Sequence, residues 1–118
     1  MPSRLWRFRL QDILEAIARI QSYTRGLTFD QFQLDRMTVD AVERNFIIIG
    51  EASRHVPDEV TGRYPSVLWR DMRDMRNVVV HGYWGVDLER VWDAIQQDLP
   101  PLVPLLQAVL QQEGDESA

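Results

Sequence analysis

Four residues that can take part in chemistry lie close together in the chain, namely Arg76, Asn77, His81 and Tyr83. An arginine can hold a phosphate through two parallel hydrogen bonds and neutralise charge that develops in a transition state. A histidine, with an ordinary pKa near ~6.5, can accept and donate protons at neutral pH. Because the 2′-hydroxyl of RNA is an internal nucleophile, this pair suits RNA cleavage without a metal. We therefore take Arg76 and His81 as candidate catalytic residues, and Asn77 as a supporting polar residue.

The spacing of Arg76 and His81 limits how they could act together. They are five positions apart, which in a regular helix places them roughly 140° apart around the axis. Either the helix tightens near Gly82 and turns His81 round, or a second copy of the chain completes the site across a symmetry axis. We favour the second solution and predict a homodimer. The third long helix, with Met72, Met75 and Val79 flanking, should lie at or near the seam.

A purely structural interpretation of the same residues remains open. His81 could simply stand at a helix end, where the helix dipole favours it, and Arg76 could form an ion pair with Asp71 or Asp74. Glu51 is similarly ambiguous: it could pair with an arginine near the site, such as Arg73 or Arg76, or it could face solvent. We therefore leave Glu51 out of the catalytic set.

Composition narrows the class of protein. The chain has 118 residues, 45% of them hydrophobic and 26% charged, which suits one globular domain. It has no cysteine and only two histidines, so we expect neither a metal site nor a cofactor. No apolar run approaches the ~20 residues of a membrane span, and we predict a cytoplasmic protein. The net charge of −5 argues against nonspecific coating of nucleic acid, although all thirteen basic residues are arginine.

The hydrophobic spacing predicts an all-α fold. Apolar residues recur at helical intervals in the ranges 3–23, 38–55 and 67–81, and again after Asp87, which is a good N-cap. A short helix capped by Thr28 should connect the first two. Pro100, Pro101 and Pro104 should kink or break the last helix. We predict an antiparallel up-down bundle of four to five helices in one domain, residues 1–112, followed by a disordered acidic tail, residues 113–118.

Three stretches of the chain resemble the HepT group of the HEPN superfamily of ribonuclease domains. These are AVERNFIIIGEASRHVP, YPSVLWRDMRDMRNVVVHGYWGVD and VWDAIQQDLPPL, and the second holds an arginine, four residues, a histidine, one residue and a tyrosine. The resemblance implies a dimeric HEPN-like bundle in which the Arg76 and His81 pairs of two protomers meet in one cleft. It also implies metal-independent RNA cleavage and the role of toxin in a type VII toxin-antitoxin system. The implied antitoxin is an MntA-like nucleotidyltransferase that silences the toxin by transferring AMP to Tyr83.

The residues around Tyr83 suit such a modification. Tyr83 lies between Gly82 and Gly85, where an adaptable backbone would let an enzyme reach the phenol. A nucleotide added there would bring negative charge and bulk to the place where substrate phosphate must bind. The alternative is that Tyr83 is an aromatic anchor that closes the helix end.

Two other classes of function compete with a ribonuclease. One is a non-catalytic helical subunit that binds or regulates a nucleotidyltransferase. The other is a structural dimerisation domain with no activity. The intact pair of Arg76 and His81 favours the enzyme, whereas the acidic net charge slightly favours the other two classes.

Overall fold

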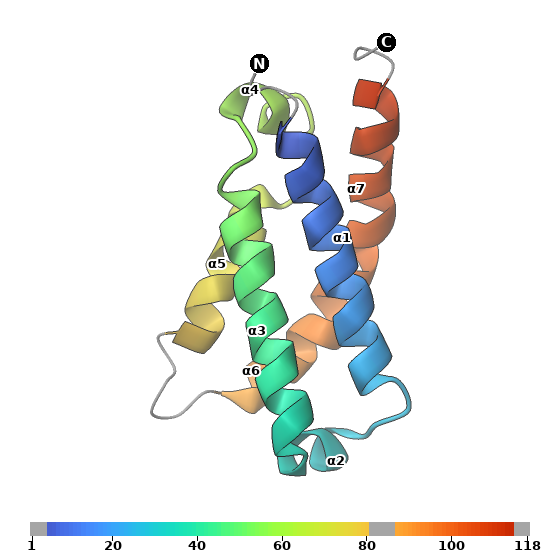
Figure 1. The fold of residues 1–118 in the computed structure, drawn as a ribbon, viewed down its shortest axis with the longest axis vertical. Coiled ribbons are helices and arrows are strands. Elements are labelled where there is room, and N and C mark those ends of the chain that lie inside the picture. The colour runs from blue at the N-terminus through green and yellow to red at the C-terminus, as the bar shows by residue number, and fades with distance from the viewer. Residues whose placement is uncertain (1–4, 81–86, 115–118) are drawn as a thin grey trace.

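The computed structural model describes residues 5–80 and 87–114, which form helices joined by turns and contain no strand. The elements are α1 (Leu5–Thr24), α2 (Phe29–Leu34), α3 (Arg36–Ser53), α4 (Asp58–Thr61), α5 (Trp69–Val80), α6 (Leu88–Asp93), a π-helical segment (Ala94–Asp98) and α7 (Leu99–Gly114). The long helices alternate in direction along the long axis (Figure 1). No helix in these ranges has the length and apolarity needed to cross a membrane. The predicted all-α antiparallel bundle is confirmed, while the homodimer stays a prediction.

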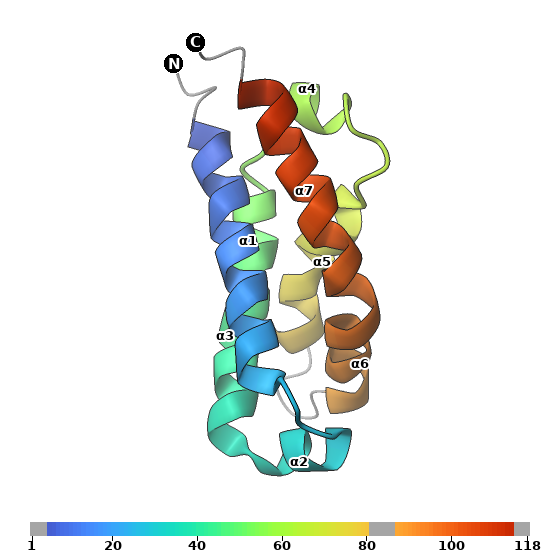
Figure 2. The ribbon, with the colours of Figure 1, turned by 90° about the vertical axis from the view of Figure 1, so that its right-hand side faces the viewer.

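Helix α3 is the central element of the bundle because it packs against α1 on one side and α5 on the other (Figures 1 and 2). The apolar positions of α3 recur every three or four residues, so they form one stripe along the helix. Five residues of this stripe are buried: Val39, Val42, Phe46, Ile49 and Ala52. The opposite face of α3 is consequently free to carry polar residues.

Local capping signals explain where the shorter elements begin. The Thr28 side chain accepts a hydrogen bond from the Gln31 backbone, and the Gln31 side chain accepts one from the Thr28 backbone, which is a capping box. Asp87 accepts from the Arg90 backbone at the start of α6, as predicted. Helix α3 begins at Arg36 rather than near Thr38, because the Asp35 side chain caps it by accepting from the Thr38 backbone.

The proline-rich end of the chain is helical, with one irregularity. A π-helical segment, Ala94–Asp98, lies directly before Pro100 and Pro101, which lack the N–H groups needed to continue the α-helical ladder. Pro104 lies inside α7 without ending it. The predicted break is therefore not observed: the helical run continues through all three prolines, and its one irregularity is the π-helical segment before the first two.

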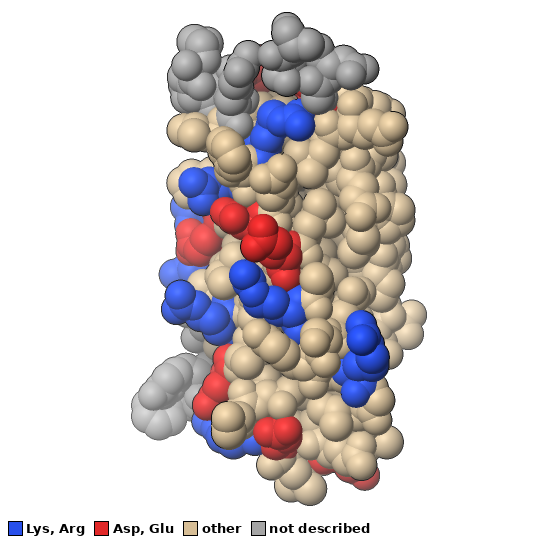
Figure 3. All heavy atoms as spheres, turned by 45° about the vertical axis from the view of Figure 1, so that its right-hand side comes forward, with Lys and Arg blue, Asp and Glu red and all other residues tan. Residues whose placement is uncertain are grey.

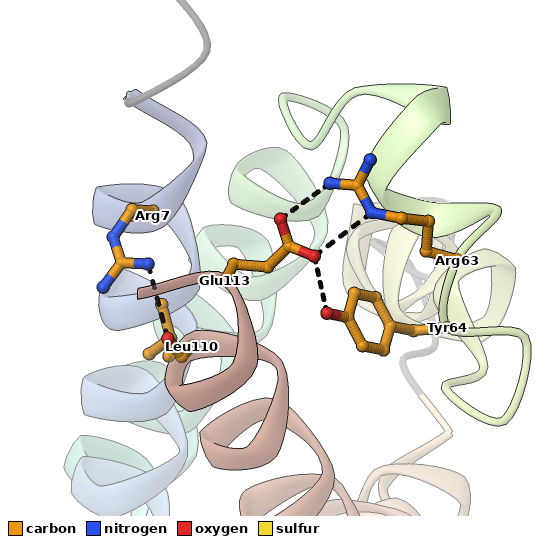
Figure 4. A network of polar contacts seen from close by, with 5 residues as sticks. All are labelled: Arg7, Arg63, Tyr64, Leu110 and Glu113. Atoms are coloured by element: carbon orange, nitrogen blue, oxygen red, sulfur yellow. Dashed lines mark hydrogen bonds and ion pairs between the residues drawn. The ribbon is translucent and has the colours of Figure 1, made fainter. Parts of the chain in front are cut away.

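The last turn of α7 is tied to the loop before α5 through Glu113 (Figure 4). Its carboxylate accepts hydrogen bonds from Arg63 Nε and Nη2, at 3.1 and 2.7 Å, and from the Tyr64 hydroxyl at 2.6 Å. Nearby, Arg7 Nη1 donates to the Leu110 carbonyl at 3.3 Å and joins α1 to α7. We predicted that a disordered tail starts at residue 113, but Glu113 is buried and belongs to α7. Residues 115–118 lie outside the described ranges.

Candidate active site

Arg76 lies on α5 and forms an ion pair with Glu51 of α3. Its Nε is 2.7 Å from Glu51 Oε1, and both side chains are partly exposed, at 39% and 42%. No described residue pairs with Arg76 Nη1 or Nη2. Of the partners left open by the sequence, Glu51 is therefore the one that the fold selects, and Asp71 and Asp74 are not. The two terminal nitrogens keep their donors for a ligand.

Gly50 explains why this pair can form. A Cβ atom at position 50 would lie 2.7 Å from Arg76 Cβ and 2.8 Å from the Arg76 backbone nitrogen. It would also lie 3.1 Å from the Arg73 carbonyl oxygen. Helices α3 and α5 therefore touch nearly backbone to backbone at this point, which only glycine permits without displacement. Since Glu51 follows Gly50 directly, this close approach brings its carboxylate beside Arg76 Nε.

Glu51 also lies beside a second arginine that the sequence interpretation did not include. Arg54 Nη1 is 3.7 Å from Glu51 Oε2, one turn further along α3. The carboxylate thus stands between two guanidinium groups, one on each helix. Its charge offsets part of theirs, which lets two arginines remain close together on this side of the bundle.

The other predicted site residues are placed as follows. Asn77 is exposed on α5, next to Arg76 in the chain. His81 and Tyr83 lie outside the described residues, so their predicted roles stay predictions. Helix α5 is described to Val80, and the cap of α6 at Asp87 begins the next described segment. The candidate residues therefore belong to the C-terminal half of α5 and the segment that directly follows it.

The prediction for the dimer seam needs correction. Met72, Met75 and Val79 were expected near an interface between protomers, but they are 0%, 5% and 6% exposed within a single chain. They pack in the protomer's own core together with Trp69. A second copy would have to contact other residues of α5.

The tryptophans described by the structure have structural roles. Trp69 is buried, and its Nε1 donates to the Tyr64 carbonyl at 3.0 Å. Trp92 packs against Phe29 and Phe32, with ring centroids 6.2 and 5.1 Å apart. Both rings thus pack within the protein itself.

Helix α5 separates a basic side from an acidic side. Asp71 and Asp74 lie roughly 140–160° from Arg76 around the helix axis. They line a groove of about 670 Å³ between α5 and α6, together with Asp93, Asp98 and Arg90. With four carboxylates and one guanidinium, this groove would repel phosphate, whereas Arg73 and Arg76 lie on the side of α5 that faces α3. An anionic ligand would therefore be attracted to the α3 side rather than to the groove.

The face over α1 and α7 offers no patch of one charge sign. Figure 3 shows blue and red side chains interleaved on one half of this face, and an uncharged upper part over α7. On α1, Arg9 pairs with Asp12 at 3.0 Å and Arg19 with Glu15 at 3.4 Å. Helix α7 has no charged residue from 99 to 112. A phosphate backbone would find little attraction here.

The described residues also contain no metal centre. No three histidine, cysteine, aspartate or glutamate side chains among residues 5–80 and 87–114 are grouped so that they could hold a metal ion. The chemistry available on the basic side of α5 is that of arginine, with Glu51 to position it.

Comparison with known proteins identifies relatives over most of the chain. Residues 13–109 match the family described as "Ribonuclease HepT-like". A Thermococcus cleftensis protein described as "Probable ribonuclease HepT" is 41% identical over 93 residues, which cover 79% of this chain and 84% of that protein. A Methanocaldococcus jannaschii protein named as a candidate RNase is 33% identical over 117 residues, covering 98% of this chain and 97% of the relative. No solved structure matches.

Proposed function

This chain belongs to the HepT-like ribonuclease family, and on that premise we propose that it is an endoribonuclease in which Arg76 and His81 are the catalytic residues. The observation that carries the proposal is the orientation of Arg76. Glu51 pairs with Nε, and the two terminal nitrogens have no partner among the described residues. Those nitrogens are the ones that form bidentate hydrogen bonds to a phosphate.

The proposed reaction uses the substrate's own nucleophile. His81 removes the proton from a ribose 2′-hydroxyl, whose oxygen attacks the adjacent phosphorus. The bond from phosphorus to the 5′-oxygen breaks, and that oxygen receives a proton, which leaves a 2′,3′-cyclic phosphate and a 5′-hydroxyl. Arg76 stabilises the charge that builds up on the phosphoryl oxygens. No step in this scheme requires a metal.

A second protomer completes the site in this proposal. The five-residue spacing separates Arg76 and His81 around a regular helix, so a cleft shared by two protomers gives each guanidinium access to a histidine. The exposed position of Asn77 beside Arg76 leaves it available to the same cleft as a phosphate or histidine ligand.

Modification of a residue in the same cleft could inhibit RNA cleavage. We assign to the protein the role of toxin in a type VII toxin-antitoxin system, with an MntA-like nucleotidyltransferase as its antitoxin. Tyr83 follows His81 by two residues, so an AMP group on its hydroxyl would carry a phosphate charge to the region of Arg76. The modified tyrosine would then compete with RNA for the guanidinium.

Replacement of each catalytic residue tests the proposal. RNA cleavage should fall by about 10²–10⁴-fold in His81→Ala, the usual loss for a general acid or base. It should fall by about 10²–10³-fold in Arg76→Ala, the usual loss when a donor that stabilises the transition state is removed. The circular dichroism spectrum should be unchanged, and the wild type should keep its activity in EDTA. Full cleavage by either purified variant, or loss of wild-type cleavage on chelation, would contradict the mechanism. A protein that binds a nucleotidyltransferase but never cleaves RNA would instead be the non-catalytic regulatory subunit.

A further inference from the structure

A pocket of about 380 Å³ lies beside the candidate active site, between the end of α3 and α5. It is lined by Arg54, Val56, Pro57, Asp58 and Arg73. Two of its five lining residues carry a guanidinium, and one carries a carboxylate. Glu51 pairs with both Arg54, which lines the pocket, and Arg76 of the candidate active site, so the two lie close together.

Arg73 is the residue of this pocket whose bonding is incomplete. Its Nε is buried and has no hydrogen-bond partner, and it forms no ion pair with any described residue. A buried donor without an acceptor costs about 1–3 kcal/mol. An acceptor oxygen reached through a small rotation of the side chain would recover that cost. An anionic ligand in the pocket supplies such an acceptor.

The arginines also lie along one line. Arg73 precedes Arg76 by three residues, so the two are about 4.5 Å apart along the axis of α5 and roughly 60° apart around it. Arg54 faces the same pocket from α3. With Glu51 and Asp58, the two acids beside them, these three arginines give the region a net charge of +1. Such a positive track suits the backbone of a single strand.

We propose that Arg54 and Arg73 form a second phosphate-binding subsite, which holds a phosphate of the RNA strand next to the one that Arg76 binds. The subsite rests on the proposed ribonuclease function and adds the direction in which the RNA strand lies on the protein. The strand runs along the side of α5 that faces α3, from the pocket at the end of α3 toward the residues after Val80. Arg54 and Arg73 bind the substrate but take no part in bond breaking.

Salt-dependent binding provides the test. The probe is a fluorescent single-stranded RNA of twelve nucleotides with 2′-O-methyl groups, which removes the nucleophile and prevents cleavage. Its affinity for the full chain is measured by anisotropy at several KCl concentrations. Each phosphate contact adds about 0.7 to the slope of log K against log salt for a single strand. Arg73→Ala and Arg54→Ala should each lower that slope by about 0.7 and weaken binding.

Arg25→Ala is the matched control, because Arg25 is an exposed arginine without an ion pair to any described residue, at the end of α1. It removes the same charge and should leave the slope unchanged. On unmodified RNA, Arg73→Ala should raise KM while kcat stays at the wild-type value, whereas Arg76→Ala should lower kcat. Arg54 is exposed, so Arg54→Ala keeps the test valid if Arg73→Ala proves unstable.

The outcomes separate the two proposals. If the wild type cleaves RNA but the Arg54 and Arg73 variants bind like Arg25→Ala, the subsite is disproved and the ribonuclease proposal stands. If the wild type neither binds nor cleaves RNA, both proposals fail. If the slope of log K against log salt is lower in Arg54→Ala and Arg73→Ala but not in Arg25→Ala, the subsite is supported.

Discussion

Glu51 and Arg76 join α3 to α5 through an ion pair in which Arg76 Nε is 2.7 Å from Glu51 Oε1. Because both side chains are partly exposed, the pair adds at most about 1 kcal/mol to the free energy of unfolding. Its effect is to orient the guanidinium, since the carboxylate holds Nε and leaves the two terminal nitrogens without a partner among the described residues. Glu51 is thus a positioning residue for Arg76.

Glu51→Gln should therefore reduce RNA cleavage while leaving stability nearly unchanged. The amide keeps the shape of the side chain but loses the charge that holds Arg76, and a misplacement of about 1 Å can cost up to about 100-fold in rate. Cleavage rate and melting temperature should be measured on the same preparation. Glu15→Gln is the control, because it breaks an exposed pair with Arg19 on α1. If Glu51→Gln and Glu15→Gln cleave RNA at equal rates, Glu51 does not position Arg76.

Gly50→Ala should destabilise the fold, contrary to the usual effect of this substitution in a helix. Alanine is favoured over glycine by about 1 kcal/mol in helix interiors. Here the added Cβ would lie 2.7 Å from Arg76 Cβ, and such overpacking costs about 1–3 kcal/mol. Urea unfolding should show the loss, and cleavage should fall because α5 is displaced. Ala18→Gly, at an exposed position of α1, measures the propensity effect alone. A more stable Gly50→Ala would refute the close contact.

Tyr83→Phe should accept no AMP from an MntA-like nucleotidyltransferase and should escape its restraint. The phenylalanine keeps the ring but lacks the hydroxyl that receives the group. Intact mass after incubation with the transferase and ATP should show one or more AMP additions to the wild type and none to the variant. Tyr23→Phe is the control, since Tyr23 is an exposed tyrosine at a distant position on α1. An adduct on Tyr23, Tyr64 or a serine, with Tyr83 unmodified, would refute the assignment.

The shared cleft predicts that two inactive variants can restore each other. When Arg76→Ala and His81→Ala protomers are mixed and allowed to exchange, each mixed dimer has one intact Arg76 and one intact His81. If the two act across the interface, cleavage should rise above that of either variant alone. Light scattering at micromolar concentration should show a dimer throughout. A monomer with full activity, or mixtures that stay inactive, would place both groups within one chain.

The parts of the fold that the sequence predicted are those governed by local signals. The buried stripe of α3, the caps at Thr28 and Asp87, and the irregularity before Pro100 all depend on residues within a turn or two of each other. The start of α3 was set two residues too late because Asp35 was not considered as the cap.

The parts that the sequence left open depend on contacts between distant elements. Whether Glu51 pairs with Arg73 or Arg76 is decided by the register of α3 against α5, which Gly50 fixes. A glycine inside a helix beside a charged residue was the available signal for that contact. The acidic composition of the end of the chain favoured solvent, yet Glu113 is bound by Arg63 and Tyr64, about fifty residues earlier.

The Glu113 contacts make the end of α7 part of the same cooperative unit as the start of α5. Opening of the last turn of α7 would release Arg63 and Tyr64 together, and Tyr64 supports Trp69, the first residue of α5. Native-state hydrogen exchange should consequently report one shared opening free energy for the amides of these two segments. Removal of residues 113–118 should accelerate exchange along α5 as well as at the C-terminus. The contacts of Glu113 would then help to keep closed the helix that presents Arg73 and Arg76.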